Sequence, residues 1–498
     1  MRRTVASLLV PEPPGSLDPR QPILVGLGAA AEGAPAVDLM ARAVRRAADD
    51  AGTTRLLASL DRVAVLQGSW SLTDPARTVA RQVGSPQART IRFEIGVSQQ
   101  EAINHALRAV RQGECETVVV VGGEARGWAR AGGVEPDEES TPPDEVIARP
   151  PDFVAAIERE AGMVWPPVVQ YALIENALAA ARGLTTAAQR DEIASLWARC
   201  NEVARSNPAA AFPAPMSADE IATPGAHNRP LAFPYNRWHA SQWTVDQATA
   251  VLVCSAGRAT EAGVPADRWL FPHVALHSSQ AVTLTARRRL HAWPGMTALG
   301  QAAEAHLGLP LRDVRLAEVY SCFPAAVRVQ QRELGLPLAG TPTLTGGMAF
   351  AGGPFNHFVL QSMVTLAARL RADPSGLGLV TTVSGMLSKP GLAVWSASPP
   401  SADRPLLVAD LGVETVAATD VAPVVRVAPT DAAATVASFT VTYGGPEGFD
   451  PVRTAVVADL ADGMRTAATC EDAATARLAL AEGLIGRDVR VKDTTFSL

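Results

Sequence analysis

A glycine-rich stretch, TGGMAFAGGPFNHFVL at residues 345–360, is the strongest indication of a functional site in this chain. Gly352 and Gly353 lose more backbone entropy on folding than other residues, but they can adopt conformations that other residues rarely adopt. Such glycines are typical of a sharp turn or of a close approach of the backbone to a ligand. Apolar residues then recur at helical spacing over residues 355–370. A glycine-rich loop that opens a helix directs N–H groups and the positive end of the helix dipole at an anion, a thioester oxygen or a phosphate. The alternative is an ordinary tight turn.

Reactive side chains lie in the motif Tyr320-Ser321-Cys322-Phe323, at the end of a predicted strand over 315–323. Parallel α/β folds place their chemistry at the carboxyl ends of strands, so Cys322 is a candidate nucleophile or acid. Its alternative role is that of a small buried hydrophobe. Tyr320 could donate a proton to a developing enolate or alkoxide, or it could serve in packing alone.

Five further residues are candidates at loops and helix starts. His357, on the first turn after the glycine-rich loop, could act in proton transfer, and Asn356 could cap that helix or bind a ligand. Ser98 could cap a helix over 98–111 whose dipole favours an anion. Ser384 and Lys389 lie on a later loop, where we expect Lys389 to be a solvated turn residue.

Composition excludes several classes of protein. The chain has 498 residues, which predicts two or three domains, and its net charge of -6 without a basic run argues against nucleic acid or an anionic membrane as partner. Five scattered cysteines without CxxC spacing indicate reduced thiols in a cytoplasmic protein, not disulfides or a metal site. No signal peptide is expected, and no apolar segment approaches the roughly 20 residues of a membrane span.

The candidate residues must be positioned by a repeated α/β architecture. Residues 22–125 alternate short β-rich runs with helical patterns, which predicts a parallel sheet flanked by helices. The alternation of β-rich runs and helical patterns resumes at residue 248 and continues to 398. We predict an N-terminal half over 1–260, with a buried strand over 117–125 and a lid-like insertion over 126–241, and a second half over 261–403. Two helices are predicted inside the insertion, over 168–181 and 187–206. After a proline-rich hinge, residues 404–498 show short alternating strands and predict a separate β-rich domain without site residues.

Several motifs together resemble the thiolase superfamily. They are NEVARSNPAAAF (201–212), HNRPLAFPYNRWHASQWTVDQATAVLVCS (227–255), AEVYSCFPAAV (317–327), the glycine-rich stretch and VTTVSGMLSKPGLAVWSASPP (380–400). They point to the thiolase-like branch of type 1, which is acetyl-CoA acetyltransferase-like and has an additional C-terminal domain. The resemblance implies an α/β fold of the duplicated thiolase type with five layers, αβαβα.

The resemblance also implies which catalytic groups are missing. The nucleophilic cysteine of thiolases would fall at about Gly96, where no sulfur lies nearby. The Gly-His-Pro triplet has become Gly352-Gly353-Pro354, and Val383 lies where the second cysteine would be. Members of the type 1 branch have an asparagine pair after Gly-Gly-Pro and a Lys-His in the last loop, whereas this chain has Phe355-Asn356-His357 and Lys389-Pro390. Conventional thiolysis or Claisen condensation is therefore not expected.

We expect a protein of lipid metabolism that binds an acyl-CoA or another acyl thioester, with acyltransferase, hydrolase or lyase activity. The alternative is a non-catalytic scaffold for an acyl carrier or another thiolase-fold protein. A homodimer through a sheet edge is implied by resemblance, with no bound cofactor besides coenzyme A as part of the substrate. The candidate catalytic residues are Cys322, His357 and Tyr320, and the candidate ligand- or oxyanion-binding residues are Gly352, Gly353, Asn356, Ser384 and Ser98.

Overall fold

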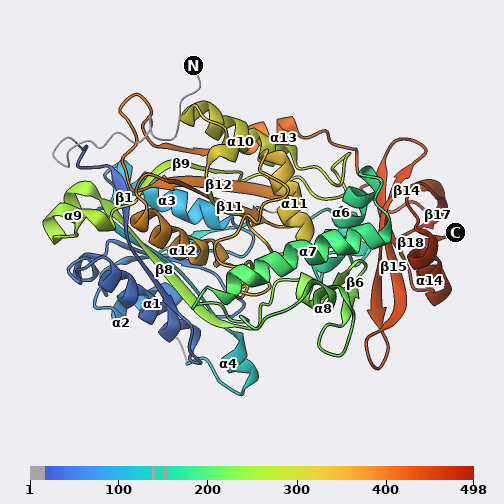
Figure 1. Cartoon of the computed structure of the whole chain (residues 1–498), viewed down its shortest axis with the longest axis horizontal. Helices are drawn as coiled ribbons and strands as arrows, with labels where there is room; N and C mark the ends of the chain where they lie inside the picture. The colour runs from blue at the N-terminus through green and yellow to red at the C-terminus, as the bar shows by residue number, and fades with distance from the viewer. Residues whose placement is uncertain (1–16, 137–140, 151–153) are drawn as a thin grey trace.

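Five layers of helices and sheets form the body of the molecule in the computed structural model, which describes residues 17–136, 141–150 and 154–498. In Figure 1 they run from top to bottom as α10 and α13, the second sheet, α3 and α12, the first sheet, and α1 and α2. The predicted duplicated α/β thiolase fold is confirmed.

The first sheet has the strand order β1-β8-β4-β2-β3-β5. Its strands are β1 (Pro22–Ala30), β2 (Arg62–Leu66), β3 (Arg89–Phe93), β4 (Thr117–Ala125), β5 (Glu145–Ile147) and β8 (Asp246–Ser255). Strands β2, β3 and β4 are parallel as predicted, and β5, which was not predicted, is parallel to β3. Strand β8 runs antiparallel to both β1 and β4. The prediction of a wholly parallel sheet is wrong there, because β8 enters from the long insertion and not through a helical crossover.

The second sheet repeats this plan with the order β10-β11-β12-β9-β13. Its strands are β9 (Phe271–His277), β10 (Leu316–Glu318), β11 (Leu377–Ser384), β12 (Lys389–Ser396) and β13 (Leu407–Asp410). As β8 does in the first sheet, β12 runs antiparallel to both of its neighbours. The sheet continues past residue 403, because β13 pairs with β9.

Two helices fill the layer between the sheets, and both begin at the candidate site. They are α3 (Gln99–Arg111), which follows Ser98, and α12 (Phe358–Ala372), which follows His357. The outer helices are α1 (Ala36–Asp50), α2 (Pro75–Gln82), α9 (Ala256–Ala262), α10 (Pro294–Leu307), α11 (Pro324–Glu333) and α13 (Gly412–Ala418). The apolar side chains of α1 and α2 form one core with the outer face of the first sheet, and a second core unites much of the remaining molecule.

The insertion after β4 supplies helices and two short strands that reach the C-terminal domain. Its elements are α4 (Arg126–Arg130), α5 (Ala156–Glu160), α6 (Val168–Ala181), α7 (Thr186–Arg205), α8 (Ala218–Ala222), β6 (Pro230–Ala232) and β7 (Tyr235–Asn236). The predicted helices over 168–181 and 187–206 correspond to α6 and α7. In Figure 1, α7 crosses the front of the molecule toward the C-terminal strands.

The C-terminal strands share one sheet with the insertion, in the order β15-β16-β18-β17-β14-β6-β7. The elements beyond β13 and α13 are β14 (Ala432–Gly444), β15 (Asp450–Leu460), β16 (Arg465–Cys470), α14 (Ala473–Glu482), β17 (Asp488–Lys492) and β18 (Thr495–Ser497). Asn176 on α6 donates to the carbonyls of Phe439 (2.8 Å) and Phe233 (3.1 Å). Ser438 Oγ donates to the Leu173 carbonyl at 2.6 Å. Backbone hydrogen bonds and a common core therefore join these strands to the insertion.

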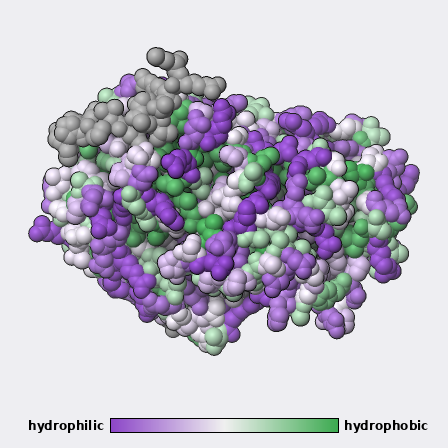
Figure 2. All heavy atoms as spheres, viewed as in Figure 1, coloured by the Kyte–Doolittle hydropathy of each residue, from purple (hydrophilic) through white to green (hydrophobic). Residues whose placement is uncertain are grey.

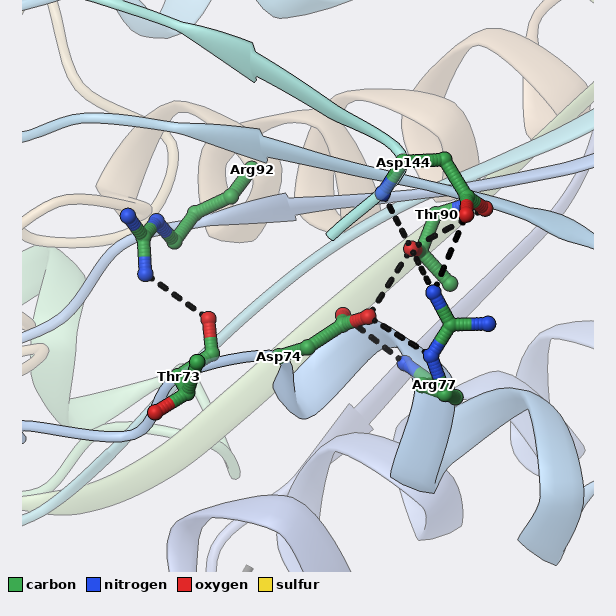
Figure 3. Close-up of polar contacts among 6 residues, drawn as sticks. All are labelled: Thr73, Asp74, Arg77, Thr90, Arg92 and Asp144. Atoms are coloured by element: carbon green, nitrogen blue, oxygen red, sulfur yellow. Dashed lines mark hydrogen bonds and ion pairs between the residues drawn. The ribbon is translucent and has the colours of Figure 1, made fainter. Parts of the chain in front are cut away.

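A polar network at the edge of the first sheet holds the chain that leads into β5 (Figure 3). Asp74, the N-cap of α2, accepts hydrogen bonds from Arg77 N (3.1 Å) and Thr90 Oγ1 (2.9 Å). Asp144 accepts from Thr90 N at 2.8 Å and forms a 3.0 Å ion pair with Arg77. Because Thr90 lies on β3, these contacts fix β5 beside that strand.

The face shown in Figure 2 has hydrophilic side chains over most of its area, with apolar ones among them. None of the described helices combines the length and the apolar character needed to cross a lipid bilayer.

Candidate functional site

The glycine-rich loop is buried and packs against the Tyr320–Phe323 turn. Met348 N donates to Ser321 Oγ at 3.1 Å. Residues 241 and 242 lie between loop and turn, because Ser241 N donates to the Cys322 carbonyl (2.9 Å) and Gly353 N donates to the Gln242 carbonyl (3.0 Å). A Cβ on Gly353 would lie 1.8 Å from Ser241 Oγ, so this close approach requires glycine.

Glu318, the last residue of β10, holds the start of the glycine-rich loop. Its carboxylate accepts hydrogen bonds from Thr343 Oγ1 (2.8 Å), Thr345 Oγ1 (2.9 Å), Thr345 N (2.9 Å) and Leu344 N. Burial raises the pKa of Glu318 to about 7, although these hydrogen bonds lower it. Sequence reasoning missed this residue, because its partners lie more than twenty positions away along the chain.

The loop at Gly96 and the last loop of the second half meet at one carbonyl. Ser384 Oγ donates to the Gly96 carbonyl at 3.0 Å, and Lys389 Nζ donates to the same oxygen. The prediction that Lys389 is solvated is wrong, since it begins β12 and is 1% exposed. Burial lowers the pKa of Lys389 to about 8, with the charge of Glu101 acting in the opposite direction.

Tyr171, on helix α6 of the insertion, connects the last loop to the Cys322 turn. Its hydroxyl donates to the Gly385 carbonyl at 3.0 Å and is also a hydrogen-bond partner of the Cys322 thiol. The Tyr171 ring stacks on Phe323 with centroids 4.5 Å apart. Nothing in the local sequence distinguished Tyr171 from any other aromatic residue on a buried helix, so it was not predicted.

The thiol and the phenol of the Tyr320–Phe323 turn are both protonated at neutral pH. Burial raises the pKa of Cys322 to about 12, although the hydrogen bond with Tyr171 lowers it. Burial also raises the pKa of Tyr320, with the nearby Cys322 adding to the shift. These groups are thus suited to donate a hydrogen bond, and a thiolate nucleophile at Cys322 is disfavoured.

His357 lies against the first sheet. A Cβ on Gly122 of β4 would lie 2.4 Å from His357 Cβ, so the two residues are in close contact. His357 is 1% exposed, and burial lowers its pKa to about 3 even with the Gln247 backbone as hydrogen-bond partner. No hydrogen bond or ring contact among the described residues joins His357 to Cys322. The imidazole is therefore neutral, and its Nε2 has no hydrogen-bond partner in the described part of the chain.

The other predicted residues surround this centre. Ser98 occupies the N-cap position of α3 as predicted, but its side chain makes no capping hydrogen bond and is 1% exposed. Asn356 does not cap α12, since its Nδ2 donates to the Gln67 carbonyl at 3.0 Å after β2. Gly352 has a φ of +95° and lies against the side chain of Gln247, which donates to the Ala351 carbonyl at 3.0 Å.

Buried polar atoms without a protein partner recur at the residues around these loops. They are Ser98 Oγ, Gln100 Oε1, Gln247 Oε1, His357 Nε2, Gln361 Oε1 and Thr382 Oγ1. Gln247 and Gln361 both donate to the Ala351 carbonyl. Buried polar groups are almost always hydrogen-bonded, because leaving one unpaired costs about 1–3 kcal/mol. Such a set of atoms is suited to form hydrogen bonds with a polar ligand.

The four loops converge through direct contacts. The Gly96 carbonyl contacts Ser384, and Tyr171 connects Gly385 to Cys322. Ser241 connects Cys322 to the glycine-rich loop. A small surface hollow lies elsewhere, between α6, α7 and α11, and none of these four loop positions lines it. The candidate site is thus a packed polar centre.

Comparison with solved structures identifies similar folds. A monomeric SCP2-thiolase-like protein of type 1 from Mycobacterium smegmatis is 27% identical, with a TM-score of 0.82, and the match covers 97% of this chain and 100% of that one. No family model matches the sequence, and no curated protein is similar to it.

More distant structures share the fold alone. An Ltp2-ChsH2(DUF35) aldolase is 19% identical with a TM-score of 0.59, and human mitochondrial 3-ketoacyl-CoA thiolase is 17% identical with a TM-score of 0.56. Each match covers 76% of this chain and 99% of the other, so about a quarter of this chain lies outside the shared fold.

Proposed function

Because this chain belongs to the thiolase superfamily and is similar to its SCP2-thiolase-like proteins of type 1, we propose that it binds an acyl-CoA or a related acyl thioester. We further propose that it acts on this ligand without a cysteine nucleophile. The single observation that carries the proposal is the convergence of Gly96, Cys322, Gly353 and Ser384 on one buried polar centre.

The proposed roles follow from the protonation states. Gly352, Gly353 and Ser98 line the thioester oxygen, and an oxyanion donor of this kind contributes about 3–4 kcal/mol to transition-state stabilisation. Since Gly353 N already donates to Gln242, its role requires that hydrogen bond to be exchanged for one to the ligand. Tyr320 and Cys322 donate hydrogen bonds to the ligand, because burial raises both pKa values and keeps the phenol and the thiol protonated.

The remaining candidates accept hydrogen bonds or position the loops of the site. Neutral His357 offers Nε2 as an acceptor, and Asn356 and Ser384 position the loops that they contact. Protonated groups that stabilise an enolate suit a lyase of the retro-aldol type better than transfer through an enzyme thioester. One structure with the same fold is an aldolase, which agrees with this choice.

Ligand binding is tested by thermal unfolding with CoA, acetyl-CoA and longer acyl-CoA esters. A ligand at 100 times its dissociation constant adds about 2.7 kcal/mol to the free energy of unfolding. If no ester raises Tm, acyl-CoA binding is ruled out.

Turnover is tested next, on a panel of thioesters. Cys322→Ala and His357→Ala should lower kcat, whereas Cys254→Ala, which changes a buried thiol on β8 away from the loops, should leave kcat unchanged. Full activity in both site variants would contradict the assigned roles. Acetoacetyl-CoA should not be cleaved by CoA, and clear thiolysis would show that the nucleophile lies elsewhere than Gly96.

A non-catalytic scaffold is the second candidate function. It is favoured by the engaged amide of Gly353 and by the Cys322 pKa of about 12, which disfavours a thiolate. In this case an acyl carrier protein or a second thiolase-fold protein would raise Tm, and no CoA ester would do so.

A further inference from the structure

The guanidinium of Arg287 is buried, and among the described residues it has fewer hydrogen-bond acceptors than it has N–H groups. The residue is 1% exposed, and its Nη2 donates to the Met386 carbonyl at 2.9 Å. Its Nε and Nη1 atoms are buried and have no hydrogen-bond partner among the residues that the structure describes. A guanidinium has five N–H groups, so most of its donor capacity is unused.

No carboxylate in the described part of the chain compensates this charge at contact distance. Ion pairs within 4 Å connect many arginines of this protein to carboxylates, but none involves Arg287. Glu158 influences it from further away, while its own oxygens accept from Thr285 N (2.8 Å) and Gln170 Nε2 (3.3 Å). Burial lowers the pKa of Arg287 to about 10, with Glu158 opposing the shift, so the group is still a cation at neutral pH. An unpaired buried cation is strongly unfavourable.

Arg287 lies next to the candidate site. Met386 follows Gly385, whose carbonyl accepts the Tyr171 hydroxyl, and Tyr171 is hydrogen-bonded to the Cys322 thiol. On the other side the C-terminal domain encloses the residue, because Arg465 donates to the Arg287 carbonyl and Val421 forms a β-bridge with it. Arg287 is therefore connected to the Cys322 turn through Met386, Gly385 and Tyr171, and a group bound at Arg287 would lie next to the candidate site.

We propose that Arg287 binds the terminal carboxylate of a dicarboxylic acyl thioester. The inference rests on the proposed function and specifies its substrate class. The two oxygens of a carboxylate match the planar fork of a guanidinium, which binds such groups in bidentate fashion. A monocarboxylic acyl chain of the same length would bury a methyl group there and leave the cation unpaired.

The test compares succinyl-CoA with butyryl-CoA, which have four-carbon acyl groups that differ in the terminal carboxylate. Isothermal titration calorimetry on the full chain should give at least a tenfold lower Kd for succinyl-CoA. In Arg287→Met the two Kd values should agree within about twofold. The exposed neighbour Arg289→Met is the matched control and should retain the preference.

A second measurement separates binding from a structural role. Removal of an uncompensated buried charge should leave the Tm of ligand-free Arg287→Met unchanged or raise it, whereas the loss of a structural contact would lower it. A lowered ligand-free Tm of Arg287→Met, together with an unchanged preference of that variant for succinyl-CoA, would overturn the proposal.

The remaining outcomes distinguish the proposed role of Arg287 from the proposed acyl-CoA binding on which it rests. Equal binding of succinyl-CoA and butyryl-CoA to the unmodified protein would overturn the role of Arg287 and leave acyl-CoA binding intact. Binding of neither ester would overturn both. Free CoA is the third ligand, and if Arg287→Met weakens its binding as much as that of succinyl-CoA, the guanidinium binds a phosphate and the carboxylate assignment is wrong.

Discussion

Desolvation is the main cause of the unusual protonation states at the candidate site. Burial is the largest cause of the pKa shifts of Cys322, His357 and Lys389. Hydrogen bonds oppose the shifts of Cys322 and His357, and the charge of Glu101 opposes that of Lys389. Each of these groups is therefore held in its neutral form more strongly than in water. A ligand that brings charge or water into the site would change all three.

The two lysines of the chain provide a direct test of this burial. The Lys389 pKa falls from 10.5 to about 8 in the folded state, so the unfolded state binds more protons between these values and stability rises with pH there. Below pH 8 both states are protonated, and the folded state bears a cost of about 3 kcal/mol. Lys389→Met should remove this rise and stabilise the protein at pH 7, as measured by urea unfolding from pH 7 to 10.5.

The exposed Lys492→Met is the matched control and should unfold like the parent at each pH. Equal pH dependence of Lys389→Met and the parent protein would show that the Lys389 amine is hydrated in solution.

The close approach of Gly353 to Ser241 gives a second prediction. Gly353→Ala should lower the free energy of unfolding by about 1–3 kcal/mol, since its Cβ would overlap the Ser241 hydroxyl. Ser241→Ala in the same chain should recover part of the loss, and a double-mutant cycle by chemical denaturation measures this coupling. Gly225→Ala, whose Cβ would meet no atom within 4 Å, should change stability by less than about 0.5 kcal/mol. Additive effects at 353 and 241 would contradict the contact.

Strand β10 positions the glycine-rich loop through one side chain. Glu318→Ala would leave two backbone N–H groups and two threonine hydroxyls without their acceptor. We expect a loss of about 2–4 kcal/mol in stability and faster hydrogen exchange at the Leu344 and Thr345 amides. Glu333→Ala, which removes a carboxylate from α11, is the control and should leave exchange at these two amides unchanged. Unchanged exchange in Glu318→Ala would mean that the loop is held by packing alone.

Most of the regular elements of the two halves could be predicted from periodicity. The helix predicted over 168–181 has those bounds in the structure, and the strand over 117–125 is β4. The strand predicted over 315–323 is shorter, because only residues 316–318 pair with β11 and the chain then turns at Tyr320. β5 was missed, since three residues without apolar alternation gain strand structure only from β3.

The C-terminal domain and the insertion should unfold together. They share a sheet through β14 and β6, and a core that includes Phe439 and Tyr171. Differential scanning calorimetry should therefore show one transition, and a chain ending at residue 430 should lose cooperative unfolding. Two separate transitions would instead support the sequence-based prediction of an independent domain.

The edge of the first sheet bears on the oligomeric state. β5 covers the outer side of β3, and the Asp74, Arg77, Thr90 and Asp144 network holds the chain that leads into it (Figure 3). A short, covered edge disfavours pairing with a second sheet. In contrast to the homodimer implied by resemblance, we expect a monomer of 52.1 kDa by light scattering. A mass twice as large would show that another surface mediates association.

The sequence by itself determined the repeated α/β plan, the position of the glycine-rich loop and the absence of sulfur at Gly96, because these depend on local composition and spacing. Only the tertiary structure decided that Lys389 is buried, that Tyr171 connects two loops and that Arg287 forms no ion pair within 4 Å among the described residues. The physical reason is that desolvation and pairing arise between residues from elements far apart in the chain. A residue's charge can be read from its type, whereas its protonation state and its partners depend on what surrounds it.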